Sequence, residues 1–75
     1  MQLVHDLDLY LDGNWYVGTW WLDNDRVWVR SWDGASECEP LGVVCDHPEL
    51  LAKHALRHLA WRGQTSPNAR LQTPA

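Results

Sequence analysis

The chain has 75 residues, enough for one domain whose core rarely contributes more than about 3–5 kcal/mol without reinforcement. Its six tryptophans are one form of reinforcement, because each large aromatic ring buries on the order of 150–250 Å². No segment reaches the roughly 18 apolar residues of a membrane span, and the acidic start lacks the basic residues and long apolar run of a secretion signal. We therefore expect a soluble, cytoplasmic protein without membrane contacts, which keeps its two cysteines reduced.

The formal net charge of −4 is divided unevenly along the chain. Residues 1–49 hold ten acidic and two basic side chains, a net charge of −8, whereas residues 50–75 hold four basic side chains and no acidic one. This division predicts an acidic sheet followed by a basic helix. Because an acidic sheet repels phosphate backbones, we do not expect nucleic acid to be a partner of that sheet.

The first half of the chain predicts two successive β-hairpins. Apolar and polar side chains alternate over His5–Leu11, which predicts a first strand over residues 1–11. The pair Asp12-Gly13 favours a type I′ turn, so a second strand follows over residues 14–22. The turn-forming residues 23–25 then lead into a third strand over residues 26–32, which is rich in Trp and Val.

The two turns each set a register, and the registers agree on which side chains share a face. A two-residue loop at Asn24-Asp25 places Trp21 opposite Trp28, and the Asp12-Gly13 turn places Leu9 opposite Tyr16. One face is then an apolar core face of Leu7, Leu9, Leu11, Tyr16, Gly18, Trp20, Leu22, Val27 and Val29. The opposite face, here named the Trp-rich face, consists of Asp6, Asp8, Tyr10, Trp15, Thr19, Trp21, Trp28, Arg30 and Trp32.

A fourth segment returns after the second DG pair, Asp33-Gly34, which predicts another tight turn. Pro40 removes one donor from the ladder, so a strand within residues 35–44 is an edge strand or ends near Glu39.

The next segment begins like a helix. Asp46 is the predicted N-cap, Pro48 lies in the first turn, and Glu49 follows three residues after the cap, as in a capping box. The helix should run to about Arg62 and stop at Gly63. Its apolar arc, which should cover the core face, consists of Leu51, Ala52, Ala55, Leu56, Leu59 and Ala60.

Together these elements predict an α+β fold: a three- or four-stranded antiparallel β-meander with one C-terminal helix packed on one face. Residues 1–63 form the single small domain. Residues 64–75 contain two prolines, few apolar residues and no periodicity, which predicts a disordered C-terminal tail.

The Trp-rich face is the first candidate site, because one helix can cover only one face of the sheet. An aromatic patch of this size usually marks an interaction site, and Trp, Tyr and Arg dominate binding hot spots. Its partner-binding candidates are Tyr10, Trp15, Trp21, Trp28, Arg30 and Trp32. Three interpretations stay open: a partner or ligand surface, a homodimer face, and internal packing in a sheet that curls into a small barrel.

The helix offers a second candidate contact. Leu50 and Trp61 fall on the side opposite the apolar arc, and Arg57 is one of the flanking basic residues. An exposed Trp among basic residues suits an acidic protein partner. The alternative is that Trp61 folds back onto the end of the sheet or the tail.

Metal binding and catalysis have less support. Cys38, Cys45, His54 and His58 have zinc-ligand types, and the two histidines have helical spacing, with His47 as a substitute ligand. However, six residues separate the cysteines, whereas a zinc knuckle brings them two to four residues apart. We therefore assign no metal and no cofactor. The paired Asp6 and Asp8 lack a pocket that would raise one pKa and exclude water, so we expect no enzyme.

These features favour a small non-enzymatic protein-binding module, either an accessory or regulatory factor or an inhibitor of a larger machine. Small acidic chains of this kind are frequent among products of phages and mobile elements. A first alternative is a small-ligand module that stacks a sugar or a methylammonium group on the indoles. A second alternative is a zinc-stabilised factor associated with nucleic acid.

Overall fold

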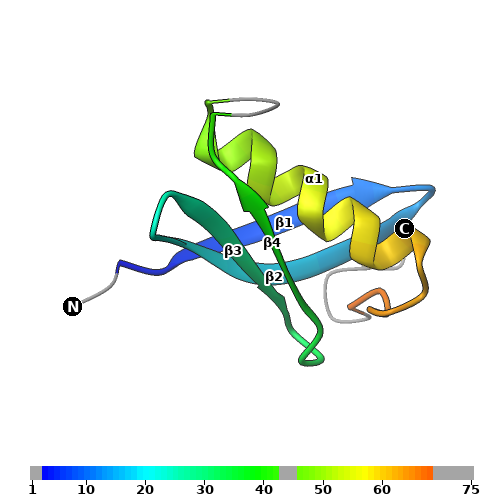
Figure 1. The fold of residues 1–75 in the computed structure, drawn as a ribbon. Helices are drawn as coiled ribbons and strands as arrows, with labels where there is room; N and C mark the ends of the chain where they lie inside the picture. The colour runs from blue at the N-terminus through cyan, green and yellow to red at the C-terminus, as the bar shows by residue number, and fades with distance from the viewer. Residues whose placement is uncertain (1–2, 43–45, 69–75) are drawn as a thin grey trace.

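The structure, a computed structural model, describes residues 3–42 and 46–68. Four antiparallel strands lie in the order β1-β2-β3-β4, and one helix, α1, crosses one face of the sheet (Figure 1). The elements are β1 (His5–Leu11), β2 (Asn14–Asp23), β3 (Arg26–Ser31), β4 (Ser36–Pro40) and α1 (Pro48–Trp61). The predicted α+β meander with one helix after the sheet is confirmed.

The register predicted from the two hairpin turns is also confirmed. Leu9 pairs with Tyr16, and Trp21 pairs with Trp28. Asp12 and Asn24 each begin their turn at a φ of 52°, and the residues that follow them also have positive φ, as a type I′ turn requires. The strand ends differ slightly from the prediction: β1 starts at His5, β2 runs to Asp23, and β3 ends one residue early, at Ser31.

The helix begins one residue later than predicted. His47, not Asp46, is the N-cap residue, and no side chain caps the helix there. The physical reason is Pro48, which occupies the first helical position and pushes the residue before it into an extended conformation. His47 has that conformation, with φ −98° and ψ 106°.

The predicted helix end at Gly63 is confirmed. Gly63 has a φ of 71°, its N–H donates to the Ala60 carbonyl, and the Gln64 N–H donates to the Leu59 carbonyl. These two bonds form a Schellman motif, in which glycine takes the left-handed position without a steric penalty.

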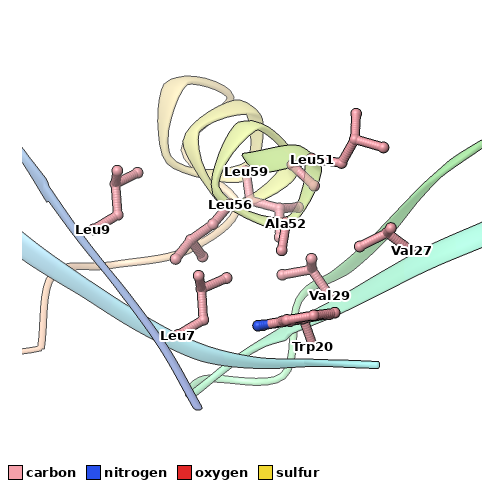
Figure 2. Packing of buried hydrophobic residues seen from close by; sticks show 10 residues of the cluster. Leu7, Leu9, Trp20, Val27, Val29, Leu51, Ala52, Leu56 and Leu59 are labelled. Carbon is pink, nitrogen blue, oxygen red and sulfur yellow. The ribbon is translucent and has the colours of Figure 1, made fainter. Parts of the chain in front are cut away.

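The core lies between α1 and the predicted apolar face of the sheet, as Figure 2 shows. Val29 and Leu56 are fully buried at its centre. Each such side chain contributes about 1.5–3 kcal/mol relative to an exposed position. The buried set is Leu7, Leu9, Trp20, Val27, Val29, Leu51, Ala52, Ala55, Leu56 and Leu59. Leu22 departs from the prediction because it is exposed next to the β2–β3 turn.

Residues 64–68, which the sequence analysis placed in a disordered tail, are instead bound to the sheet. Thr65 and Ser66 donate hydrogen bonds to the Asp33 carboxylate. The Asn68 N–H donates to the Trp15 carbonyl of β2. The first residues of β2 lie beyond the end of β3, so the Trp15 carbonyl is not paired with β3. Residues 69–75 of the predicted tail lie outside the described residues.

Candidate functional site

The Trp-rich face lies on the side of the sheet that α1 does not cover. The core residues of β3 are buried under α1, and Trp28 and Arg30 alternate with them on the opposite side. Tyr10 is 59 % exposed, whereas Trp15, Trp21 and Trp28 are half-buried. The sheet stays open, since β1 and β4 form its two edges. Internal packing in a closed barrel is therefore not the arrangement of the described residues.

The partial burial of the indoles comes from neighbouring strands. Trp21 and Trp28 are direct cross-strand partners, and such aromatic pairs contribute roughly 0.2–1 kcal/mol relative to an alanine pair. The rings of Tyr10 and Trp15 meet edge to face, with centroids 5.2 Å apart. The surface is therefore a set of ordered rings and not a group of independent side chains.

Charge is arranged in strips along this face. Asp6 and Asp8 lie on β1, next to β2 on one side, and Arg26 and Arg30 lie on β3, next to β2 on the other side, with Trp28 between the two arginines. Asp6 pairs with Thr19, and Thr19 pairs with Arg30, so all three occupy one row across the sheet. Within the described part of the chain, neither Asp6 nor Arg30 forms a salt bridge.

Trp32 differs from the other residues of this face, because the segment after the helix binds it. Its Nε1–H donates a 2.8 Å hydrogen bond to the Ser66 carbonyl, although half of the side chain remains exposed. Its indole N–H is thus already satisfied within the chain. The sequence contained no signal for this contact, since residues 64–68 have no periodic pattern.

The helix residues Leu50, Arg57 and Trp61, here named the helix stripe, are partly or largely accessible. Leu50 is 56 % exposed and Trp61 is 63 % exposed. The Arg57 guanidinium lies 5.8 Å from the centroid of the Trp61 ring, within the range of a cation–π contact. Trp61 therefore does not fold into the sheet. Leu50 and Trp61 are separated by about 16 Å along the helix axis, so they do not form one continuous patch.

His54 and His58, whose helical spacing the sequence showed, lie in a cluster between β4 and α1 whose third member, Glu39, was not predicted. Glu39 approaches His54 and His58, and one ligand atom from each lies within 4.8 Å of the others. The two imidazole rings have centroids 4.2 Å apart. We name this the Glu-His cluster. Its signal in the sequence was the alternation at Glu37, Cys38 and Glu39, which turns both glutamates toward the helix.

The same alternation places Cys38, which the sequence offered as a zinc-ligand type, away from the two histidines. Cys38 pairs with Trp28 and points to the Trp-rich face, where it accepts a weak 3.8 Å contact from Arg26. It therefore does not converge with His54 and His58. Cys45 lies outside the described residues.

Glu37 lies beside the Glu-His cluster and is 14 % exposed in its side chain. Its Oε1 accepts a 2.8 Å bond from Arg62. Its Oε2 is 3.8 Å from Nδ1 of His58. That oxygen is buried and accepts no hydrogen bond from the described residues.

Asp33 links the β3–β4 turn to the segment after the helix. The Ser31 hydroxyl, the Thr65 hydroxyl and the Ser66 N–H all donate to its carboxylate. The Ser31 hydrogen bond is the largest cause that lowers the pKa of Asp33 below its usual value, and partial desolvation opposes it. Asp33 thus has a structural role in holding residues 64–68.

The helix in the described ranges is too short and too polar to cross a bilayer. Comparisons of the chain with protein-family models, with curated proteins and with solved structures find no match.

Proposed function

We propose that this chain is a non-enzymatic, cytoplasmic protein-binding module, an accessory, regulatory or inhibitory factor, whose Trp-rich face binds a second copy of itself. The observation that carries the proposal is the face opposite α1, where half-buried indoles are bordered by an acidic strip on β1 and a basic strip on β3. Trp, Tyr and Arg side chains are the residues most enriched in protein-binding hot spots.

The order of the two charged strips favours a second copy as the occupant. A two-fold axis that runs parallel to the strands and above β2 exchanges left and right across the sheet. It therefore sets β1 of one copy above β3 of the other. Because Asp6, Thr19 and Arg30 share one row, Asp6 of each copy then faces Arg30 of its partner. Self-complementarity of this kind is what a two-fold interface requires.

The aromatic side chains supply the apolar centre of the same interface. Trp21 and Trp28 occupy the row two residues along from Thr19 and Arg30, so they lie near the proposed axis. Stacked sheets pack about 10 Å apart, a distance that interleaved indoles fill. The charged side chains on β1 and β3 then flank Trp21, where they set orientation more than affinity.

This arrangement leaves the helix stripe of each copy pointing away from the interface, since α1 lies on the other face of the sheet. Leu50, Arg57 and Trp61 would then meet a partner protein with an acidic surface. The exposed Trp61 ring and the Arg57 guanidinium next to it support that chemistry.

Charge exchange tests the proposed dimer directly. The full chain is measured by sedimentation equilibrium as wild type, as Asp6→Arg, as Arg30→Asp and as the double variant. Each single change places like charges opposite each other, and the double variant restores opposite charges. We expect each single variant to weaken the dimer by about tenfold and the double variant to recover most of that loss. Asp46→Arg, an equal charge change away from the face, is the matched control.

A second variant tests the apolar centre. Trp28→Ala should abolish dimer formation while the helix content seen by circular dichroism is retained, because Trp28 lies outside the core cluster. A wild-type chain that stays monomeric at millimolar concentration would overturn the proposal. Loss of dimer in both single variants without recovery in the double variant would also overturn it. Quenching of Trp fluorescence by an oligosaccharide or a methylated peptide, in a monomeric chain, would support the small-ligand alternative instead.

A further inference from the structure

We propose that the Glu-His cluster binds one divalent transition-metal ion, with zinc as the best match, and that the ion joins the edge strand β4 to α1. Glu39, His54 and His58 would supply the three protein ligands. This proposal is independent of the Trp-rich face, which lies on the other side of the sheet.

The backbone brings the three side chains together from two elements. Glu39 pairs with Val27 of β3, whose side chain is buried under α1, so Glu39 points toward the helix. His54 and His58 are four residues apart on α1, and residues with that spacing lie on the same side of a helix. The site therefore depends on the packing of helix and sheet and exists only in the folded chain.

The distances fit a site that can close around an ion. Zinc binds imidazole nitrogen and carboxylate oxygen at about 2.0–2.2 Å, which separates tetrahedral ligand atoms by about 3.3 Å. The three ligand atoms are already within 4.8 Å of one another. All three residues are half-buried, so small rotations of their side chains would close the remaining gap and an ion can enter from solvent.

The ligand types determine the class of metal. Two imidazoles and one carboxylate suit zinc and other first-row transition metals, whereas calcium and magnesium prefer oxygen ligands. Three protein ligands leave a fourth position for water or for a group from a partner. Cys38, on the opposite face of the sheet, is not part of this set.

Glu37 gives the cluster a feature that a simple ion pair does not explain. Its buried Oε2 lies 3.8 Å from Nδ1 of His58 and accepts no hydrogen bond from the described residues. A histidine that binds metal commonly donates its other N–H to a carboxylate, which fixes the ring and makes it a better ligand. With a proton on Nδ1, His58 would donate to Glu37 and offer Nε2 to the ion.

Calorimetric titration of the full chain with zinc chloride tests the proposal. We expect one ion per chain and an increase in melting temperature with zinc, because an ion that binds only the folded state stabilises it. Glu39→Gln and His54→Gln should each lower the affinity at least about tenfold. His5→Gln is the matched control, because His5 lies on β1, the edge strand opposite β4, where it stacks on Trp20 and is not part of the cluster.

The two cysteines require their own control, since thiolates bind zinc strongly. The Cys38→Ser/Cys45→Ser variant should keep the zinc affinity of the wild type, and the cobalt complex of the wild-type chain should show no thiolate charge-transfer absorption. Absence of binding at 100-fold excess zinc would overturn the proposal. It would be overturned equally if the cysteine variant lost the zinc, or if Glu39→Gln and His54→Gln bound zinc as tightly as His5→Gln.

Discussion

The hydroxyl of Thr65 donates a 2.7 Å hydrogen bond to Oδ1 of Asp33, across 32 residues of chain. Thr65 is 5 % exposed, so the bond is shielded from water on the threonine side. The same carboxylate accepts bonds from Ser31 and from the Ser66 N–H. A single acidic side chain in the β3–β4 turn therefore holds the segment that follows the helix.

Removal of the buried hydroxyl should destabilise the fold. Thr65→Val leaves the side-chain volume nearly unchanged but removes a charge-assisted hydrogen bond, which costs about 1–3 kcal/mol. Urea denaturation measures the loss. Ser36→Ala is the control, because Ser36 is exposed on β4 and its replacement should change the free energy of unfolding by less than about 0.5 kcal/mol. Equal stability of the two variants would contradict the assigned role of Thr65.

The Asp33 contacts also predict a pH dependence of stability. The hydrogen bond from Ser31, followed by those from Thr65 and Ser66, lowers the pKa of Asp33 below its usual value of 3.8. A folded-state pKa below the unfolded one means that the carboxylate stabilises the fold above the unfolded pKa. That contribution is lost as the pH falls through the folded pKa.

Denaturation midpoints measured from pH 6 down to pH 2 check this sign. We expect the wild type to lose more stability than Asp33→Asn over this range, since asparagine cannot titrate. Parallel curves for the two proteins would show that Asp33 does not contribute to the acid sensitivity.

Gly18 occupies a close approach between β2 and β3, and a larger residue should not fit. A Cβ atom at this position would lie 2.4 Å from the Arg30 carbonyl oxygen, a backbone atom that cannot rotate away. We expect Gly18→Ala to destabilise the protein by about 1–3 kcal/mol through separation of the two strands. Thermal melting measures the effect, and Thr19→Ala on the same strand should cost much less.

Two leucines of α1 allow the loss of stability from a buried position to be compared with that from an exposed one. Leu56 is fully buried, whereas Leu50 is largely exposed. Leu56→Ala should cost about 2–5 kcal/mol because it leaves a cavity, and Leu50→Ala should cost less than about 0.5 kcal/mol. Both substitutions change helix propensity equally. The difference between the free energies of unfolding of the two variants, measured by chemical denaturation, therefore gives the contribution of core packing.

The sheet could be predicted well because two independent turns constrained the same faces. The Asp12-Gly13 turn placed Leu9 opposite Tyr16, and the Asn24-Asp25 turn placed Trp21 opposite Trp28. A one-residue slip in either turn would have put core side chains and surface side chains on the same face of the sheet. Periodicity of this kind is local, so it can be read from the chain. The apolar arc of α1 could be predicted for the same reason.

The contacts that sequence reasoning missed depend on tertiary packing. The bond from Thr65 to Asp33 joins a polar segment to a turn, and neither has an apolar pattern. Glu39 meets His54 and His58 only because α1 lies over β4, a placement that no local spacing specifies. The N-cap prediction was wrong for a local reason. Asp46 is a common N-cap residue type, but Pro48 restricts the backbone of the residue before it, His47, to the extended conformation that an N-cap has.

Because residues 64–68 bind the β3–β4 turn and the end of β2 that β3 does not reach, the last turn of α1 is anchored on the side where helices usually fray. Opening of that turn must break the bonds to Asp33 as well as those of the helix. Amide protons of Leu59 and Ala60 should therefore exchange with deuterated solvent nearly as slowly as those of Val29, so that the terminal turn and the sheet open as one unit.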